Sequence, residues 1–168
     1  MPDRTDIVPV RYADPLSSHL PMVDAMTERL HVVAGCLLDR HQRLLIVRKR
    51  GTDVYMLPGG KPESGETPMA TLLREWQEEL GGELAEPHLV LLGRFSAPAA
   101  HEPDTIVDAD VFEIDHAILE LMTPAAGGEI EAVDWLALDD QSDPQRLAPL
   151  LRDAILPALR ERHDIGID

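Results

Sequence analysis

Three glutamates at helical spacing are the residues of this sequence best suited to chemistry. Glu75, Glu78 and Glu79 stand at positions i, i+3 and i+4, so in a helix all three project from one face. Carboxylates this close repel one another and destabilise a bare helix. A hard divalent cation with oxygen ligands would offset that repulsion, so the acidic face predicts a metal site.

The helix that must carry these acids is marked at both ends. Thr67 can serve as its N-cap, and Pro68 fits the first helical position, where a missing N–H costs nothing. Gly81 and the glycine after it supply a left-handed stop. An apolar stripe, largely opposite the carboxylates, comprises Met69, Leu72, Leu73, Trp76 and Leu80. Glycines and prolines interrupt residues 57–66 before it, so that segment is predicted to be a loop.

The loop and helix together carry a spaced motif over residues 60–81. Its specified positions are Gly60, Glu66, Arg74, Glu75, Glu78, Glu79 and Gly81. This pattern resembles the Nudix box of the MutT-like diphosphate hydrolases, and the flanking pattern resembles that family over roughly residues 30–160. Two residues depart from the family: Gly82 replaces an aliphatic residue, and Trp76 is bulkier than the usual Leu, Ile or Val. Neither is a catalytic position, so these differences concern local packing.

The resemblance implies an α/β protein with the Nudix fold, an α/β/α sandwich with a mixed β-sheet. It also implies a hydrolase dependent on Mg²⁺, with Mn²⁺ as an alternative, because the metal lowers the pKa of water and neutralises phosphate oxygens. The substrate would be a nucleoside diphosphate linked to a group X. Conversion of a nucleoside triphosphate to monophosphate and pyrophosphate is the leading subclass. ADP-ribose, nucleotide sugars and dinucleoside polyphosphates are the alternatives, and a catalytically silent nucleotide-binding regulator is the non-enzymatic one.

The resemblance also assigns roles within the motif. Glu75, Glu78 and Glu79 match the metal-binding glutamates, one of which acts as the base or orients it; the sequence leaves open which one. Glu66 would support the loop or the metal shell, and the backbone of Gly60 would approach the metal or the phosphates closely, which a side chain would prevent. The matching arginine, Arg74, would pair with a carboxylate and orient it.

Several residues outside the motif are weaker candidates. The cations Arg48, Lys49 and Arg50 precede the loop and would grip phosphates, although a solvated strand end explains them equally well. The family often recruits another acid, for which Glu129 and Glu131 are candidates at the start of the last predicted strand.

Other chemistry-bearing residues have plainer interpretations. His101 is expected in an ordinary loop rather than against substrate, and Asp108 and Asp110 on a solvent-facing edge strand. Cys36 is expected to be a core thiol rather than a nucleophile. Its strand position also disfavours the isopentenyl diphosphate isomerases, relatives that use a cysteine.

Composition narrows the class of partner. The net charge of −16 argues against binding to a nucleic acid polymer or an anionic membrane, which need basic surfaces. The single cysteine excludes an intramolecular disulfide and fits a reducing compartment. The longest apolar run has nine residues, too few to span a bilayer, and no signal peptide is indicated. These features predict a cytoplasmic protein. The resemblance implies a small nucleotide or other diphosphate as its partner, and a homodimer stays open, because the family often dimerises.

The expected organisation is an N-terminal extension (1–28), a Nudix hydrolase domain (29–162) and a C-terminal tail (163–168). Strands are predicted at 30–38, 44–50, 54–57, 88–95, 106–114 and 130–138. A helical stripe follows residue 143, and Pro149 and Pro157 should divide it into one short and one longer helix.

Overall fold

Two β-sheets form the centre of the molecule in the computed structural model, which describes residues 27–167. In order across the first sheet lie β4 (Gly59–Gly60), β1 (Glu28–Leu37), β6 (Thr105–Ile114) and β5 (Leu89–Pro98). Across the second lie β3 (Tyr55–Met56), β2 (Arg43–Lys49) and β7 (Ile130–Ala137). The expected N-terminal extension falls almost entirely outside the described residues.

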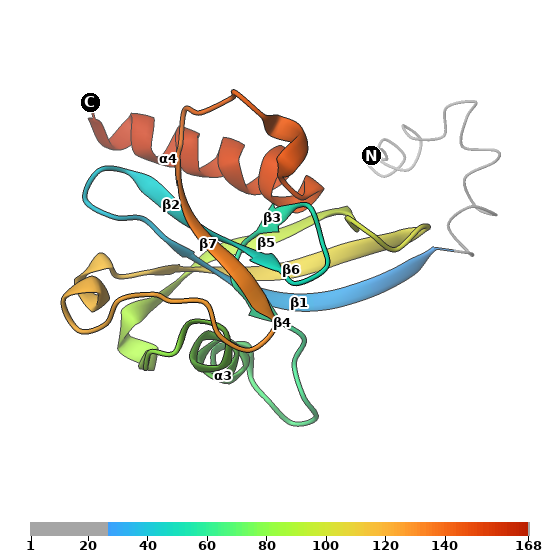
Figure 1. Cartoon of the computed structure of the whole chain (residues 1–168), viewed down its shortest axis with the longest axis horizontal. Helices are drawn as coiled ribbons and strands as arrows, with labels where there is room; N and C mark the ends of the chain where they lie inside the picture. Colours follow the sequence, from blue (N-terminus) through green and yellow to red (C-terminus); the bar gives the residue numbers. More distant parts are fainter. Residues whose placement is uncertain (1–26, 168) are drawn as a thin grey trace, which may run out of the picture.

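The strands and helices make the predicted α/β/α sandwich with mixed pairing. β1 and β6 run parallel, whereas the other pairs are antiparallel. Helix α3 (Pro68–Leu80) lies on one side of the sheets and α4 (Leu156–Ile167) on the other (Figure 1). Short helical turns connect them at η2 (Glu86–His88), η3 (His116–Glu120) and η4 (Pro144–Arg146). No helix in the described part of the chain is long and apolar enough to cross a membrane.

The central strands bury both of their faces. Because side chains alternate along a strand, Val33 and Leu37 of β1 join the core beneath α3, whereas Ala34 and Cys36 join the core beneath α4. This double burial explains why the sequence of β1 shows a continuous apolar run instead of alternation. Cys36 is only 1% exposed, and burial raises the pKa of its thiol far above the usual range, which agrees with a core thiol.

The segment predicted as a loop before α3 contains a two-residue strand. In β4, Gly59 pairs with Ala34 and Gly60 with Val33. Gly59 has φ +150°, and a Cβ there would collide with the carbonyl oxygen of Val33. The loop prediction missed β4 because two glycines carry no local strand signal.

The predicted edge strand at 106–114 is internal, which corrects the expectation for Asp108 and Asp110. β6 lies between β1 and β5, and β5 is the edge strand on that side of the sheet. Asp110 is buried and accepts hydrogen bonds from His31 Nε2 (2.8 Å) and Arg94 Nε (2.8 Å). Asp110 is thus held by side chains from both neighbouring strands, His31 on β1 and Arg94 on β5.

The C-terminal helical segment changes hydrogen-bond pattern instead of breaking. The π-helix η5 (Leu150–Ile155) continues directly into α4, and the N–H of Leu156 donates to the carbonyl of Leu151. The change falls beside Pro157, which has no N–H to donate. α4 reaches Ile167, so the helix includes most of the expected tail; Arg162 fastens it to Glu113 at 2.9 Å.

Candidate active site

Helix α3 forms with the predicted caps, and these caps orient its acidic face. The Thr67 side chain accepts a hydrogen bond from the Ala70 N–H (3.1 Å). Gly81 adopts φ +81°, and its N–H donates to the carbonyl of Gln77 (3.0 Å). Trp76 and its apolar neighbours are buried against the sheets, so the glutamates face the opposite way, toward β4 and a cavity.

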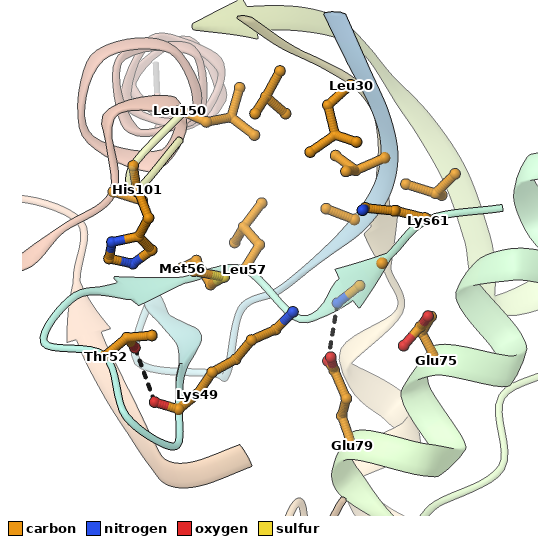
Figure 2. Close-up of a pocket in the computed structure, with 18 of the residues that line it drawn as sticks. Leu30, Lys49, Thr52, Met56, Leu57, Lys61, Glu75, Glu79, His101 and Leu150 are labelled. Atoms are coloured by element: carbon orange, nitrogen blue, oxygen red, sulfur yellow. Dashed lines mark hydrogen bonds between the residues drawn. The ribbon is translucent and has the colours of Figure 1, made fainter. Parts of the chain in front are cut away.

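The cavity has a volume of about 810 Å³ and two chemically different ends. Its charged lining residues are Lys49, Lys61, Glu75, Glu78, Glu79, Glu102 and Glu129. The aliphatic ones are Leu30, Val32, Val33, Ala34, Met56, Leu57, Pro98, Ala100, Val107, Ala148, Pro149 and Leu150. Glu75 and Glu79 lie on one side, across the cavity from Leu150 and His101 (Figure 2).

Glu79 is the most deeply buried of the three glutamates, at 5% exposed. Its Oε1 accepts a hydrogen bond from the Gly59 N–H (3.0 Å), which ties the helix to β4. Burial raises the pKa of Glu79 to about 7, and the charges of Glu75 and Glu129 push it in the same direction. A carboxyl group with a pKa near neutrality can accept or donate a proton under physiological conditions.

Glu75 lies beside the same strand and depends on a glycine for its position. Burial raises the pKa of Glu75, although Arg74 opposes this shift by donating from Nη1 (3.1 Å). A Cβ at Gly60 would collide with the Glu75 carboxylate. Glycine at position 60 therefore allows the strand and the carboxylate to approach each other.

Arg74 and Glu66 form a two-pronged ion pair that joins the loop to the helix. Arg74 Nε donates to one Glu66 oxygen (2.7 Å) and Nη2 to the other (3.0 Å). Glu66 also accepts from Thr71 Oγ1 (2.9 Å) and from the Glu63 N–H (2.8 Å). These hydrogen bonds, above all that from Arg74, lower the pKa of Glu66 to about 2. Arg74 also lies in contact with Glu75 and Glu78, whereas Glu66 does not line the cavity.

Among the three cations before the loop, Lys49 alone lines the cavity. Its side chain points toward the Gly59–Glu79 hydrogen bond (Figure 2). Arg48 instead donates to the Thr52 carbonyl (2.9 Å) and pairs with Glu131 (3.2 Å), and Arg50 donates to the Gly128 carbonyl (3.3 Å). The pairing of β2 with β7 shifts its register between Arg48 and Lys49, which is where the arginine that faces away from the cavity is followed by the lysine that lines it.

The two candidate acids outside the motif lie in different environments. Glu129 lines the cavity, whereas Glu131 is held at the surface by Arg48. Glu129 follows a turn that packs on the end of α3, where the Gly127 N–H donates to the Glu79 carbonyl (2.8 Å). No local sequence pattern indicates this turn, because its partner lies nearly fifty residues earlier in the chain.

The apolar wall of the cavity and the place of His101 in it were not predicted from the sequence. Leu30 and Val32 of β1, Val107 of β6 and Leu150 of η5 meet there, although they are distant in sequence. The one local signal is the i, i+2 spacing of Leu30 and Val32, which places both on one face of β1. His101, expected in an ordinary loop, lies in the β5–β6 connection and lines the cavity.

The donor chemistry of the acidic end fits a hard divalent cation. Within residues 27–167 no three acidic, histidine or cysteine side chains converge as a ready metal cage, because Arg74 draws Glu75 and Glu78 to itself at 3.1 and 3.4 Å. Nevertheless, all three glutamates face the cavity, and carboxylate oxygens are the ligands that Mg²⁺ prefers. The raised pKa values of Glu75 and Glu79 mark negative charge that a cation would stabilise.

Comparison with known proteins assigns the family. Residues 29–157 match the model of the NUDIX domain, so the chain belongs to the Nudix family. It is 34% identical over 119 residues to the putative 8-oxo-dGTP diphosphatase 2 of Mycobacterium tuberculosis, covering 64% of this chain and 81% of that protein. It is 40% identical over 58 residues to the 8-oxo-dGTP diphosphatase of Proteus vulgaris, covering 32% of this chain but only about half (52%) of that relative.

A solved structure supports the fold independently. The MutT protein of Methanosarcina mazei superposes with a TM-score of 0.65 at 19% identity, covering 81% of this chain and 96% of that one. At this identity the likeness concerns the fold, which agrees with the α/β/α sandwich expected from the sequence.

Proposed function

We propose that this chain is a divalent-metal-dependent hydrolase that cleaves a diphosphate linkage in a small nucleotide. The observation that carries the proposal is the buried Glu79, which lies with Glu75 at the acidic end of a cavity of about 810 Å³. A cavity of this size falls in the range that small-molecule ligands occupy. The Nudix family membership supports the same chemistry.

The proposed metal ligands are Glu75, Glu78 and Glu79, with the backbone of Gly60 nearby. Bound Mg²⁺, or Mn²⁺ in its place, would screen phosphate oxygens and lower the pKa of water. Arg74 would hold Glu75 in position, and Glu66 would hold Arg74, through the contacts described above. Glu66 thus has a positioning role in this account, because both of its oxygens are already engaged.

Glu79 is the proposed proton acceptor. It lines the cavity where a water can reach it, and the Gly59 N–H fixes one of its oxygens so that the other is oriented. Lys49 and Lys61, which also line the cavity, would neutralise phosphate oxygens of the substrate. Glu129 lines the same cavity and is the alternative acceptor.

Nucleoside triphosphates are the proposed substrates, with nucleoside monophosphate and pyrophosphate as products. The names of the two sequence relatives, both 8-oxo-dGTP diphosphatases, favour this class over ADP-ribose, nucleotide sugars and dinucleoside polyphosphates. The proposal includes a cytoplasmic location, which the free, buried thiol of Cys36 supports.

The test is a nucleotide panel assayed with excess Mg²⁺ and with a chelator. The panel contains normal and oxidised deoxynucleoside triphosphates, ADP-ribose, nucleotide sugars and dinucleoside polyphosphates, and the products are separated by chromatography. We expect Mg²⁺-dependent release of monophosphate and pyrophosphate from triphosphates. Tight, calorimetrically detected nucleotide binding without turnover would instead identify a silent nucleotide-binding regulator.

A further inference from the structure

The half of the cavity away from the glutamates is built from aliphatic side chains. Leu30 and Val32 come from β1, Val107 from β6, Met56 from β3 and Leu150 from η5. All five are only partly buried, so they present apolar surface to the cavity. We call these five residues the aliphatic chamber. Because it opens toward Glu75 and Glu79, a nucleotide cleaved there would place its nucleoside part in the chamber (Figure 2).

Few polar side chains accompany the aliphatic chamber. Among the cavity-lining residues that the structure describes, none is Asn, Gln, Arg, Ser, Asp or Tyr. Thr52 is present, but its hydroxyl donates to the Lys49 carbonyl (2.9 Å). His101, Glu102 and Lys61, which Figure 2 draws beside Leu30, are the other polar groups near this side, and all three are exposed. The chamber therefore lacks a buried side chain that could read the hydrogen-bonding edge of a base.

The type of contact that a binding site makes with its ligand limits how strongly the site discriminates between related ligands. A pocket that uses apolar contact separates related substrates by only about 10–200-fold, because it cannot strongly reject a ligand that adds one polar group. A site with buried hydrogen-bonding groups rejects the wrong ligand by about 10⁴–10⁵-fold, because its own polar groups are then left unpaired. Normal and oxidised guanine differ in their hydrogen-bonding groups and hardly in their apolar faces.

We infer that the aliphatic chamber binds the base by shape and apolar contact, which makes this chain a broad nucleoside triphosphate hydrolase. This inference rests on the proposed function. Several bases are accepted, and kcat/KM for 8-oxo-dGTP and dGTP differs by no more than about 200-fold. Leu150 and Leu30 contact the base from opposite walls of the chamber.

The test combines a base panel with matched leucine substitutions. kcat and KM are measured with Mg²⁺ for 8-oxo-dGTP and the four normal deoxynucleoside triphosphates, on wild type, Leu150→Asn and Leu121→Asn. Leu121 is 75% exposed and does not line the cavity, so Leu121→Asn controls for the same change of side chain. Leu30→Asn serves as a second chamber variant, with folding of every variant checked by circular dichroism.

The inference predicts turnover of all five triphosphates within about 200-fold of one another. It also predicts that each chamber variant raises KM about tenfold or more for all of them at little cost to kcat, while Leu121→Asn changes neither. A preference above about 10³-fold for one base, or folded chamber variants with unchanged KM, would overturn the inference and leave the hydrolase intact. No turnover of any triphosphate would overturn the inference together with the triphosphate substrates of the proposed function.

Discussion

At the level of single residues, burial distinguishes three glutamates that the sequence presents as equivalent. The Glu79 residue is 5% exposed, whereas the side chains of Glu75 and Glu78 are 17% and 58% exposed. Because removal from water penalises the charged form of a carboxyl group, the buried position has the most strongly raised pKa. The same feature that makes Glu79 the proposed proton acceptor should also make it a cost to stability.

Because of this cost, the free energy of unfolding of the metal-free protein should depend on pH. The pKa of Glu79 is about 7 in the folded state against an ordinary 4.5, so the folded state retains this proton longer than the unfolded state as pH rises. The free energy of unfolding therefore falls as the pH rises from about 4.5 to about 7, by up to about 3 kcal/mol for this group. Glu79→Gln removes the titration, so it should stabilise the protein in the presence of a chelator at about pH 8 and progressively less toward pH 5.

The measurement is the free energy of unfolding by urea across that pH range. Glu83→Gln is the matched control, because Glu83 is exposed just beyond α3 and does not line the cavity. A difference between wild type and Glu79→Gln that stays constant with pH would contradict the raised pKa.

The Arg74–Glu66 pair should act on catalysis as a single unit. Arg74→Lys loses the two-pronged contact and the hydrogen bond to Glu75, so we expect kcat/KM to fall about 10–100-fold, as for other residues that orient metal ligands. Glu66→Gln should produce a loss of the same kind. Because both changes disturb one contact, the double variant should lose little more than Arg74→Lys alone. Multiplicative losses would show that the two residues act separately.

At the level of elements, β4 fixes the distance between the strand backbone and α3. The collision expected between a Cβ at Gly60 and the Glu75 carboxylate can be tested by a double-mutant cycle. Gly60→Ala should destabilise the protein by about 1–3 kcal/mol, but by less than about 1 kcal/mol in a Glu75→Ala background, where the carboxylate is gone. Equal costs in both backgrounds, measured by urea unfolding with a chelator present, would assign the effect to the strand backbone.

Helix α3 is held against its core by Trp76, whose indole N–H has no hydrogen-bond partner in the described structure. Trp76→Phe removes that donor and keeps most of the ring, so we expect a cost of only about 1–2 kcal/mol. Trp76→Ala should cost about 3–5 kcal/mol, because it leaves a cavity. Thermal and urea unfolding of both variants give the comparison. Similar losses for Phe and Ala would mean that the N–H contributes a hydrogen bond.

The sequence predicted those features of the helices and strands that depend on neighbouring residues, and it did not predict those that depend on distant ones. The ends of α3 were predictable because Thr67, Pro68 and Gly81 act within one turn of the helix. β4 was not, because two glycines become a strand only through pairing with β1. Lys49 lines the cavity and its neighbouring arginines do not, and this difference depends on a register shift of β2 against β7 that no local sequence pattern encodes.

At the level of the whole molecule, the sandwich brings its two chemical environments together. The core beneath α3 places the acidic face of that helix beside β4, and the core beneath α4 places Leu150 across the cavity from it. The motif alone predicted the acidic end, because its residues lie within 22 positions of one another. The aliphatic chamber forms only when β1, β3, β6 and η5 come together in the fold, so it could not be predicted from local sequence patterns.

The most direct test of the account is the turnover number of Glu79→Gln with the best triphosphate from the panel and saturating Mg²⁺. Wild type and Glu83→Gln should have the same kcat within about twofold, because Glu83 lies outside the cavity. Glu79→Gln should retain its fold and lose about 10²–10⁴-fold in kcat, the usual loss when a proton-transferring group is removed. A folded Glu79→Gln protein with nearly full kcat would contradict the claim that the buried end of the α3 acidic face performs the chemistry.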